Sequence, residues 1–144
     1  MALKFGTIKQ TVFIQATPHQ VYDALLDPEK HSAFTGSPAT TNSKVGVEFN
    51  AWDGYITGKN LELAKDKKIV QEWETTGWPE GYPRSRLELT LTPKKGGTEL
   101  KMVHSNVPAE QVKSYTGGWH ESYWDPLKLY FADEKPKRKA KKTD

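Results

Sequence analysis

The chain has 144 residues, a formal net charge of +3, a hydrophobic share of 35% and no cysteine. This length suits one domain that buries its own core without cross-links. The lack of cysteine excludes disulfides, thiolate metal sites and cysteine nucleophiles. Because we find neither a signal-peptide pattern nor an apolar run of about 18 residues, we expect a soluble cytoplasmic protein with no membrane insertion.

The positive charge is concentrated at the C-terminal end. Residues 134–144 hold six basic and two acidic side chains, so this segment has a net charge of +4 and the rest of the chain −1. We therefore expect one domain over residues 1–133 and a disordered basic tail over residues 134–144. Nucleic acid is expected as a partner only weakly, through this tail, because the tail has no interleaved aromatic residues.

The N-terminal segment predicts a strand. In residues 7–15 the apolar side chains Ile8, Val12 and Ile14 fall on one face, and Gln10 is the polar exception on that face. This alternation is typical of a strand with one buried side.

Two short helices are predicted next. Thr17 precedes a proline and stands three residues before Gln20, which is a capping box that begins a helix. The pair Asp27-Pro28 ends this helix, because the residue before proline is pushed out of helical geometry. A second short helical turn is expected within residues 29–37, before a group of breaking residues.

The middle of the chain predicts a series of antiparallel strands. Alternating apolar residues mark five of them, over residues 45–51, 55–63, 69–75, 84–91 and 98–105. Tight turns are expected at Asp53-Gly54 and Gly96-Gly97. Glu72 and Glu74 share one strand face, and Arg84 and Arg86 share another, which predicts a solvent-facing ladder of opposite charges rather than a catalytic carboxylate pair.

A long helix is predicted over residues 107–131. Its apolar residues recur at steps of three and four and are mostly aromatic: Val112, Tyr115, Trp119, Tyr123, Leu127 and Tyr130. Pro126 interrupts the pattern and predicts a kink near residues 122–126. One face of the antiparallel sheet needs a cover, and this helix is the large amphipathic element available, so the expected fold is an α+β arrangement of about six or seven strands curved around a long C-terminal helix.

Four histidines could carry chemistry, but none pairs with another at a metal-binding spacing. We expect His19 and His31 in solvent. His104 shares a face with Leu100 and Met102 and should point toward the interior, where it is either a hydrogen-bonded packing residue or a ligand contact. Ser105 lies on the opposite face, which argues against a serine–histidine pair with its neighbour.

The loop over residues 77–83 is rich in glycine and proline and carries Trp78 and Tyr82. Aromatic side chains in such a loop are typical of a lid or of a docking site for a partner. The alternative is that they fold back onto the core.

The order of elements and several short segments resemble the Aha1 C-terminal-like family, named after the activator of Hsp90 ATPase, within the Bet v 1-like or START-related superfamily. The segments that carry this resemblance are Ala16-Thr17-Pro18, Val21–Leu25, Asp27-Pro28, Val45-Gly46, Phe49, Asp53-Gly54, Gly58, Ile69-Val70, Trp73, Gly97-Thr98, Leu100, His104–Pro108, Gly117–Trp119, Leu127 and Tyr130. They span roughly residues 7–132. The chain departs from the family pattern at Pro126, and at Asn106, where glycine is expected.

The resemblance implies a helix-grip fold with a cavity between sheet and helix that holds an apolar small molecule. The residues expected to line it are Trp73, His104, Tyr115, Trp119, Tyr123 and Leu127. We expect a non-catalytic binding domain without a cofactor or metal, with a lipid-like or aromatic small molecule and, as the family name implies, a chaperone as partners. A cavity-based cyclase or hydrolase with His104 and a tyrosine as proton carriers is the alternative.

Overall fold

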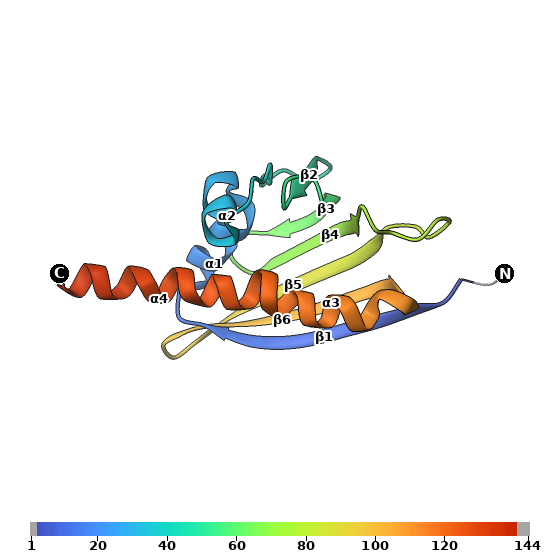
Figure 1. Ribbon diagram of the computed structural model, residues 1–144. Coiled ribbons are helices and arrows are strands. Elements are labelled where there is room, and N and C mark those ends of the chain that lie inside the picture. The colour runs from blue at the N-terminus through green and yellow to red at the C-terminus, as the bar shows by residue number, and fades with distance from the viewer. Residues whose placement is uncertain (1–2, 141–144) are drawn as a thin grey trace.

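The structure, a computed structural model, describes residues 3–140, and for residues 133–140 only the backbone. Its strands form one antiparallel sheet in the order β1-β6-β5-β4-β3-β2. The strands are β1 (Phe5–Ile14), β2 (Glu48–Ala51), β3 (Ile56–Ala64), β4 (Lys68–Thr75), β5 (Ser85–Lys94) and β6 (Gly97–Pro108). The six strands and their antiparallel order confirm the predicted sheet (Figure 1).

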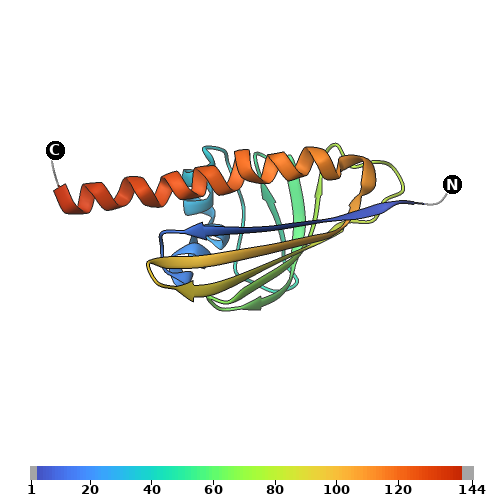
Figure 2. The same cartoon turned by 90° about the horizontal axis from the view of Figure 1, so that it is seen from below.

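A long helical segment crosses one face of the curved sheet (Figure 2). It begins with a 3-10 turn η1 (Ala109–Gln111) and continues through α3 (Val112–Trp119), the π-helical turn η2 (His120–Trp124) and α4 (Asp125–Ala140). Its inner side chains and those of the sheet form one buried core. The α+β fold with a sheet around a C-terminal helix is therefore confirmed.

Two short helices follow β1, as the capping residues predict. In α1 (Pro18–Leu26), the Thr17 hydroxyl accepts the Gln20 N–H at 3.1 Å, and the Gln20 side chain accepts the Thr17 N–H at 2.9 Å. In α2 (Pro28–Thr35), the Asp27 carboxylate accepts the Lys30 N–H at 3.0 Å. Asp27 thus ends one helix and begins the next, because its extended backbone fits both ends.

The strand predicted from residue 45 begins only at Glu48. Val45 and Val47 do not alternate into the core and are 59% and 40% exposed. The cause is Asn60, a fully buried residue of β3 whose amide donates to the carbonyls of Asn42 at 3.1 Å and Lys44 at 3.0 Å. These side-chain bonds hold the segment before β2 as a loop, so the alternation of valines was misleading.

The kink predicted near residues 122–126 stays a prediction, and the helix there has a π-turn in place of regular α-helical geometry. The turn covers His120–Trp124, and the N–H of Asp125 donates to the carbonyl of His120, five residues earlier. Proline has no N–H, and its ring clashes with the carbonyl four residues before it in a regular α-helix. A single wider turn accommodates this clash, and the helix continues past Pro126.

Gln10, the polar exception in the first strand, joins β1 to the helix before the π-turn and at the last residue of that turn. Its amide nitrogen donates to the carbonyl of Thr116 at 2.9 Å, and its carbonyl oxygen accepts the indole N–H of Trp124 at 2.7 Å. The His120 N–H donates to Gly117 rather than to Thr116. Gln10 therefore supplies a partner to a helix carbonyl next to the irregular turn.

Asn106, which stands where glycine was expected, has φ 59°. This is the left-handed region, which asparagine tolerates better than most residues.

The charged ladder predicted on the outer face of the sheet is confirmed. Arg84 binds Glu74 at 2.9 Å and Glu48 at 3.1 Å, and Glu72 pairs in register with Arg86.

The division into a domain over residues 1–133 and a tail over 134–144 stays a prediction. The α4 helix includes residues 134–140 of the expected tail, and residues 141–144 lie outside the described part.

Candidate functional site

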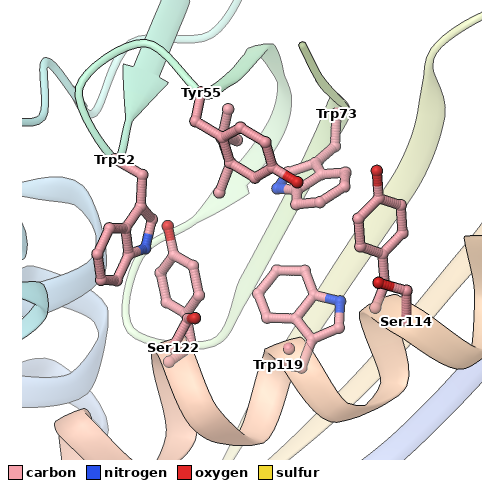
Figure 3. Close-up of a pocket in the computed structure, with 10 residues that line it drawn as sticks. Trp52, Tyr55, Trp73, Ser114, Trp119 and Ser122 are labelled. Atoms are coloured by element: carbon pink, nitrogen blue, oxygen red, sulfur yellow. The ribbon is translucent and has the colours of Figure 1, made fainter. Parts of the chain in front are cut away.

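A pocket of about 280 Å³ opens between the C-terminal helix and the hairpin that joins β2 to β3 (Figure 3). Its lining residues are Trp52, Tyr55, Ile56, Trp73, Ser114, Tyr115, Gly118, Trp119, Ser122 and Tyr123. Four of the six residues predicted to line a cavity are therefore together here: Trp73, Tyr115, Trp119 and Tyr123.

Aromatic rings form most of the pocket wall. Trp119 lies at its centre, with ring centroids 5.5 Å from Trp73 and 5.0 Å from Tyr123. Figure 3 shows Trp52, Tyr55 and Trp73 on the sheet side and Trp119 on the helix side. Such a wall offers large apolar contact area and ring faces for stacking.

The rim of the pocket is polar. The Tyr115 hydroxyl is hydrogen-bonded to Thr75 Oγ1 at 2.7 Å, and the nearby Tyr55 side chain adds to the rise in the pKa of Tyr115. Burial is the main cause that raises the pKa of Tyr115, so its phenol stays protonated at neutral pH. Tyr55, whose side chain also lines the pocket, is 46% exposed.

His104 is a packing histidine behind the pocket and does not line it. It is fully buried, its Nδ1 accepts the indole N–H of Trp119 at 3.1 Å, and its Nε2 lies 2.7 Å from Ser85 Oγ. Because an indole nitrogen only donates, Nδ1 carries no proton, and Nε2–H donates to Ser85, whose hydroxyl donates to the carbonyl of Trp73.

The bonds of His104 leave neither ring nitrogen free for proton transfer. Burial lowers the pKa of His104 to about 3, so the ring is neutral at physiological pH. The serine that contacts it is Ser85 on the neighbouring strand, which is 1% exposed. The pair therefore ties β5, β6 and the helix together instead of forming a nucleophile open to a substrate.

His31 is buried, contrary to the expectation that it lies in solvent. It is 5% exposed, its Nδ1 donates to the carbonyl of Leu25 at 3.0 Å, and its Nε2 accepts the hydroxyl of Tyr123 at 3.0 Å. Burial lowers the pKa of His31 and raises that of Tyr123. His19 is largely exposed and pairs with Asp66 at 2.9 Å, so the expectation holds for that histidine.

The remaining predicted site residues are not among those that line the pocket. Leu127 is fully buried in the core below α4. Trp78 folds back and stacks on Tyr115 with a centroid distance of 6.1 Å. Tyr82 packs edge-on against Phe5 at 5.4 Å. In this conformation the loop covers the N-terminal end of β1 and one side of Tyr115.

The expected internal cavity is mostly filled by side chains. Trp124 is fully buried and stacks on Trp119 at 5.3 Å, and it occupies the space between helix and sheet. A void of about 30 Å³ remains deeper in the core. Between the C-terminal helix and the sheet, the open pocket therefore has space for a small molecule and that void does not.

Sequence reasoning missed six pocket residues: Trp52, Tyr55, Ile56, Ser114, Gly118 and Ser122. Two signals could have found most of them. Trp52 and Tyr55 flank the predicted Asp53-Gly54 turn. On the helix, Ser114, Gly118 and Ser122 follow one another at steps of four beside the aromatic stripe.

The long C-terminal helix held in a curved antiparallel sheet, with two helices after the first strand, defines a helix-grip protein of the Bet v 1-like or START-related type. Residues 15–132 match the family described as "Activator of Hsp90 ATPase homolog 1-like protein". The chain belongs to this Aha1-like family, as its sequence indicated.

Individual relatives agree with this assignment. The human "Activator of 90 kDa heat shock protein ATPase homolog 1" is 33% identical over 125 residues, which cover 87% of this chain and 36% of the human protein. A homologue of that activator from Dictyostelium discoideum is 29% identical over 127 residues, which cover 88% of this chain and 33% of the relative. The chain thus spans about a third of the length of the curated relatives it matches.

The fold also matches a solved structure. The crystal structure of an HSP90 activator from Plasmodium falciparum superposes with a TM-score of 0.80 at 24% identity and covers 88% of this chain and 96% of the other. At this identity the likeness supports the fold alone.

Proposed function

We propose that this chain is a binding domain that holds an apolar small molecule in the pocket between its C-terminal helix and the β2–β3 hairpin. The observation that carries the proposal is a pocket of about 280 Å³ with a mainly aromatic wall. This is close to the lower end of the roughly 300–1,000 Å³ of common small-molecule sites, and an apolar wall with few polar groups is typical of them. No catalytic step is proposed, because His104 has no free ring nitrogen.

Intrinsic fluorescence tests this proposal, because three of the five tryptophans line the pocket. We expect a saturable change in emission when an apolar dye such as 1-anilinonaphthalene-8-sulfonate is added. The variant Ser122→Leu, which places a large side chain on the pocket wall, should weaken that response. Native mass spectrometry of the purified protein gives an independent readout of a co-purified molecule. Equal dye binding by both proteins and no bound mass would contradict the proposal.

A second proposal concerns a chaperone. Membership of the Aha1-like family and 33% identity to a human activator of a heat shock protein ATPase support the role of a chaperone-associated module. Because the chain covers 36% of that relative, the activity of the whole relative does not transfer to it directly. Separately, none of the helices within residues 3–140 has the length and hydrophobicity needed to cross a membrane.

The steady-state ATPase rate of an Hsp90-type chaperone, measured with increasing amounts of this protein, tests the chaperone role. We expect a saturable increase in rate, with an unrelated protein of similar mass as the control. An unchanged rate together with no binding by calorimetry would refute this role. The pocket proposal would be unaffected by that result.

A further inference from the structure

Gly118 marks the helix side of the pocket. It lies in the interior of the C-terminal helix, where glycine is unfavourable because of its backbone freedom. Close packing does not require glycine there, since a Cβ built at Gly118 meets no heavy atom within 4 Å other than those of its two chain neighbours and the helix's own backbone. Such a Cβ would be added at the pocket wall, so the missing side chain leaves space in the pocket.

The size of this space limits what fits. Ser114 and Ser122 stand one turn to either side of Gly118 and also line the pocket, so its helix wall combines small residues with the ring of Trp119. An apolar cavity of about 150 Å³ accommodates benzene. At about 280 Å³, this pocket is suited to a flat molecule of about two fused rings.

Two polar features lie at the pocket wall. The indole N–H of Trp52 is buried and has no acceptor among the described residues, and the Trp52 backbone is held at φ 53°, a left-handed conformation that is unusual for a bulky residue. At the rim, Tyr55 is 46% exposed as a residue and its hydroxyl lies near that of Tyr115. A ligand with one polar group could therefore bond at the rim while its rings contact the wall.

From these features we infer that the ligand is a planar aromatic molecule of about two rings with one hydroxyl or carbonyl group, and that Gly118 sets the depth to which its rings enter. This inference rests on the proposed small-molecule function and specifies the ligand class. The rings stack between Trp119 and the hairpin residues, and the polar group bonds to Tyr55 at the open side.

Calorimetric titration with 2-naphthol and with naphthalene tests the inference, because the two probes share a ring system and differ by one hydroxyl. Wild type should bind both, and 2-naphthol more tightly. Gly118→Leu should weaken both by at least about tenfold. Gly117→Ala is the matched control, since this neighbouring glycine does not line the pocket, and it should bind as wild type does. Tyr55→Phe should weaken 2-naphthol about fivefold and leave naphthalene unchanged.

Two measurements keep the outcome decisive. Ser122→Leu narrows the same wall one turn away and replaces Gly118→Leu if that variant fails to fold. A nitrogen–proton correlation spectrum, with the Trp52 indole signal assigned through Trp52→Phe, should show this signal moving as 2-naphthol is added.

Unchanged affinity for both naphthalene probes in both leucine variants would overturn the inference. If neither naphthalene probe binds wild type but the anilinonaphthalene dye does so in a Ser122-dependent way, the ligand class is wrong and the proposed function stands. If no probe binds, both fail.

Discussion

The two halves of the C-terminal helix meet the sheet in different ways. In the second half, Trp124, Leu127 and Phe131 are buried at 0%, 0% and 5% exposure and fill the space beneath the helix. In the first half, Gly118 and Ser114 leave part of the space open. Along a single helix, the size of the side chains facing the sheet decides whether the interface is packed or hollow.

Polar cross-links, in contrast, are present along the whole helix. Gln10 bonds to Thr116 and Trp124, and His104 bonds to Trp119, so both halves are joined to the sheet. At the pocket end, the hairpin residues Trp52 and Tyr55 face the helix across open space (Figure 3). We therefore expect mutations in the packed half to affect stability and mutations at the pocket to affect binding.

The largest effect is expected for Trp124→Ala. This change removes a fully buried ring and the hydrogen bond to Gln10, and it should lower the free energy of unfolding by about 3–5 kcal/mol. Tyr55→Ala on the exposed rim is the matched control and should lower it by less than about 1 kcal/mol. Urea unfolding followed by circular dichroism measures both. Similar losses for the two variants would mean that the packed and open halves do not differ as described.

Acid should destabilise the core through its buried histidines. The folded pKa of His104, about 3, lies below the ordinary value of 6.5, and that of His31 is also lowered, so the unfolded chain binds more protons as pH falls through 6.5. The histidines' contribution to the free energy of unfolding is therefore fully present above pH 6.5. It falls as the pH is lowered, by about 1.4 kcal/mol per pH unit for each histidine that remains neutral when folded.

Unfolding measured between pH 7.5 and 5 tests this pH dependence. The variant His104→Gln should be less stable than wild type at pH 7.5 and should have a shallower slope below pH 6.5. His120→Gln, which changes an exposed residue of the helix, serves as the control. A slope in His104→Gln as steep as in wild type would argue that His104 does not link protonation to folding.

A smaller effect of opposite sign is expected at the open half. Gly117→Ala and Gly118→Ala should each raise the free energy of unfolding by about 1 kcal/mol, because alanine is a better helix former and neither added methyl group meets a neighbour. Thermal melting measures this gain. A loss of stability in Gly118→Ala alone would show that close packing, rather than space for a ligand, explains the glycine.

The smallest effect is expected on the outer face of the sheet, away from both halves of the helix. Arg84→Ala removes bonds to Glu74 and Glu48, yet these side chains are partly exposed at 31% and 57%. The expected loss is below about 1 kcal/mol, and it should shrink at high salt because solvent and ions screen such pairs. A double-mutant cycle with Glu74→Ala isolates the pair. A coupling well above this value at high salt would contradict the expectation.

The sequence alone was sufficient for the elements and their order. The capping box at Thr17, the stop at Asp27-Pro28, the turn at Asp53-Gly54 and the irregularity before Pro126 all depend on interactions between residues close in the chain, so a local pattern reports them reliably. The aromatic stripe of the last helix also identified three of the pocket residues, Tyr115, Trp119 and Tyr123. The start of β2 was predicted wrongly because Asn60, 18 residues after Asn42, decides it.

Tertiary structure decided which of these residues stand beside open space and which are packed. Tyr115 and Leu127 belong to the same sequence pattern, but one lines the pocket and the other is in the core. His31 appears polar and surface-like in the sequence, yet a bond to Tyr123, 92 residues away, makes burial favourable. Local patterns identify a helix's inner face, whereas the volume left beneath it depends on side chains contributed by distant strands and hairpins.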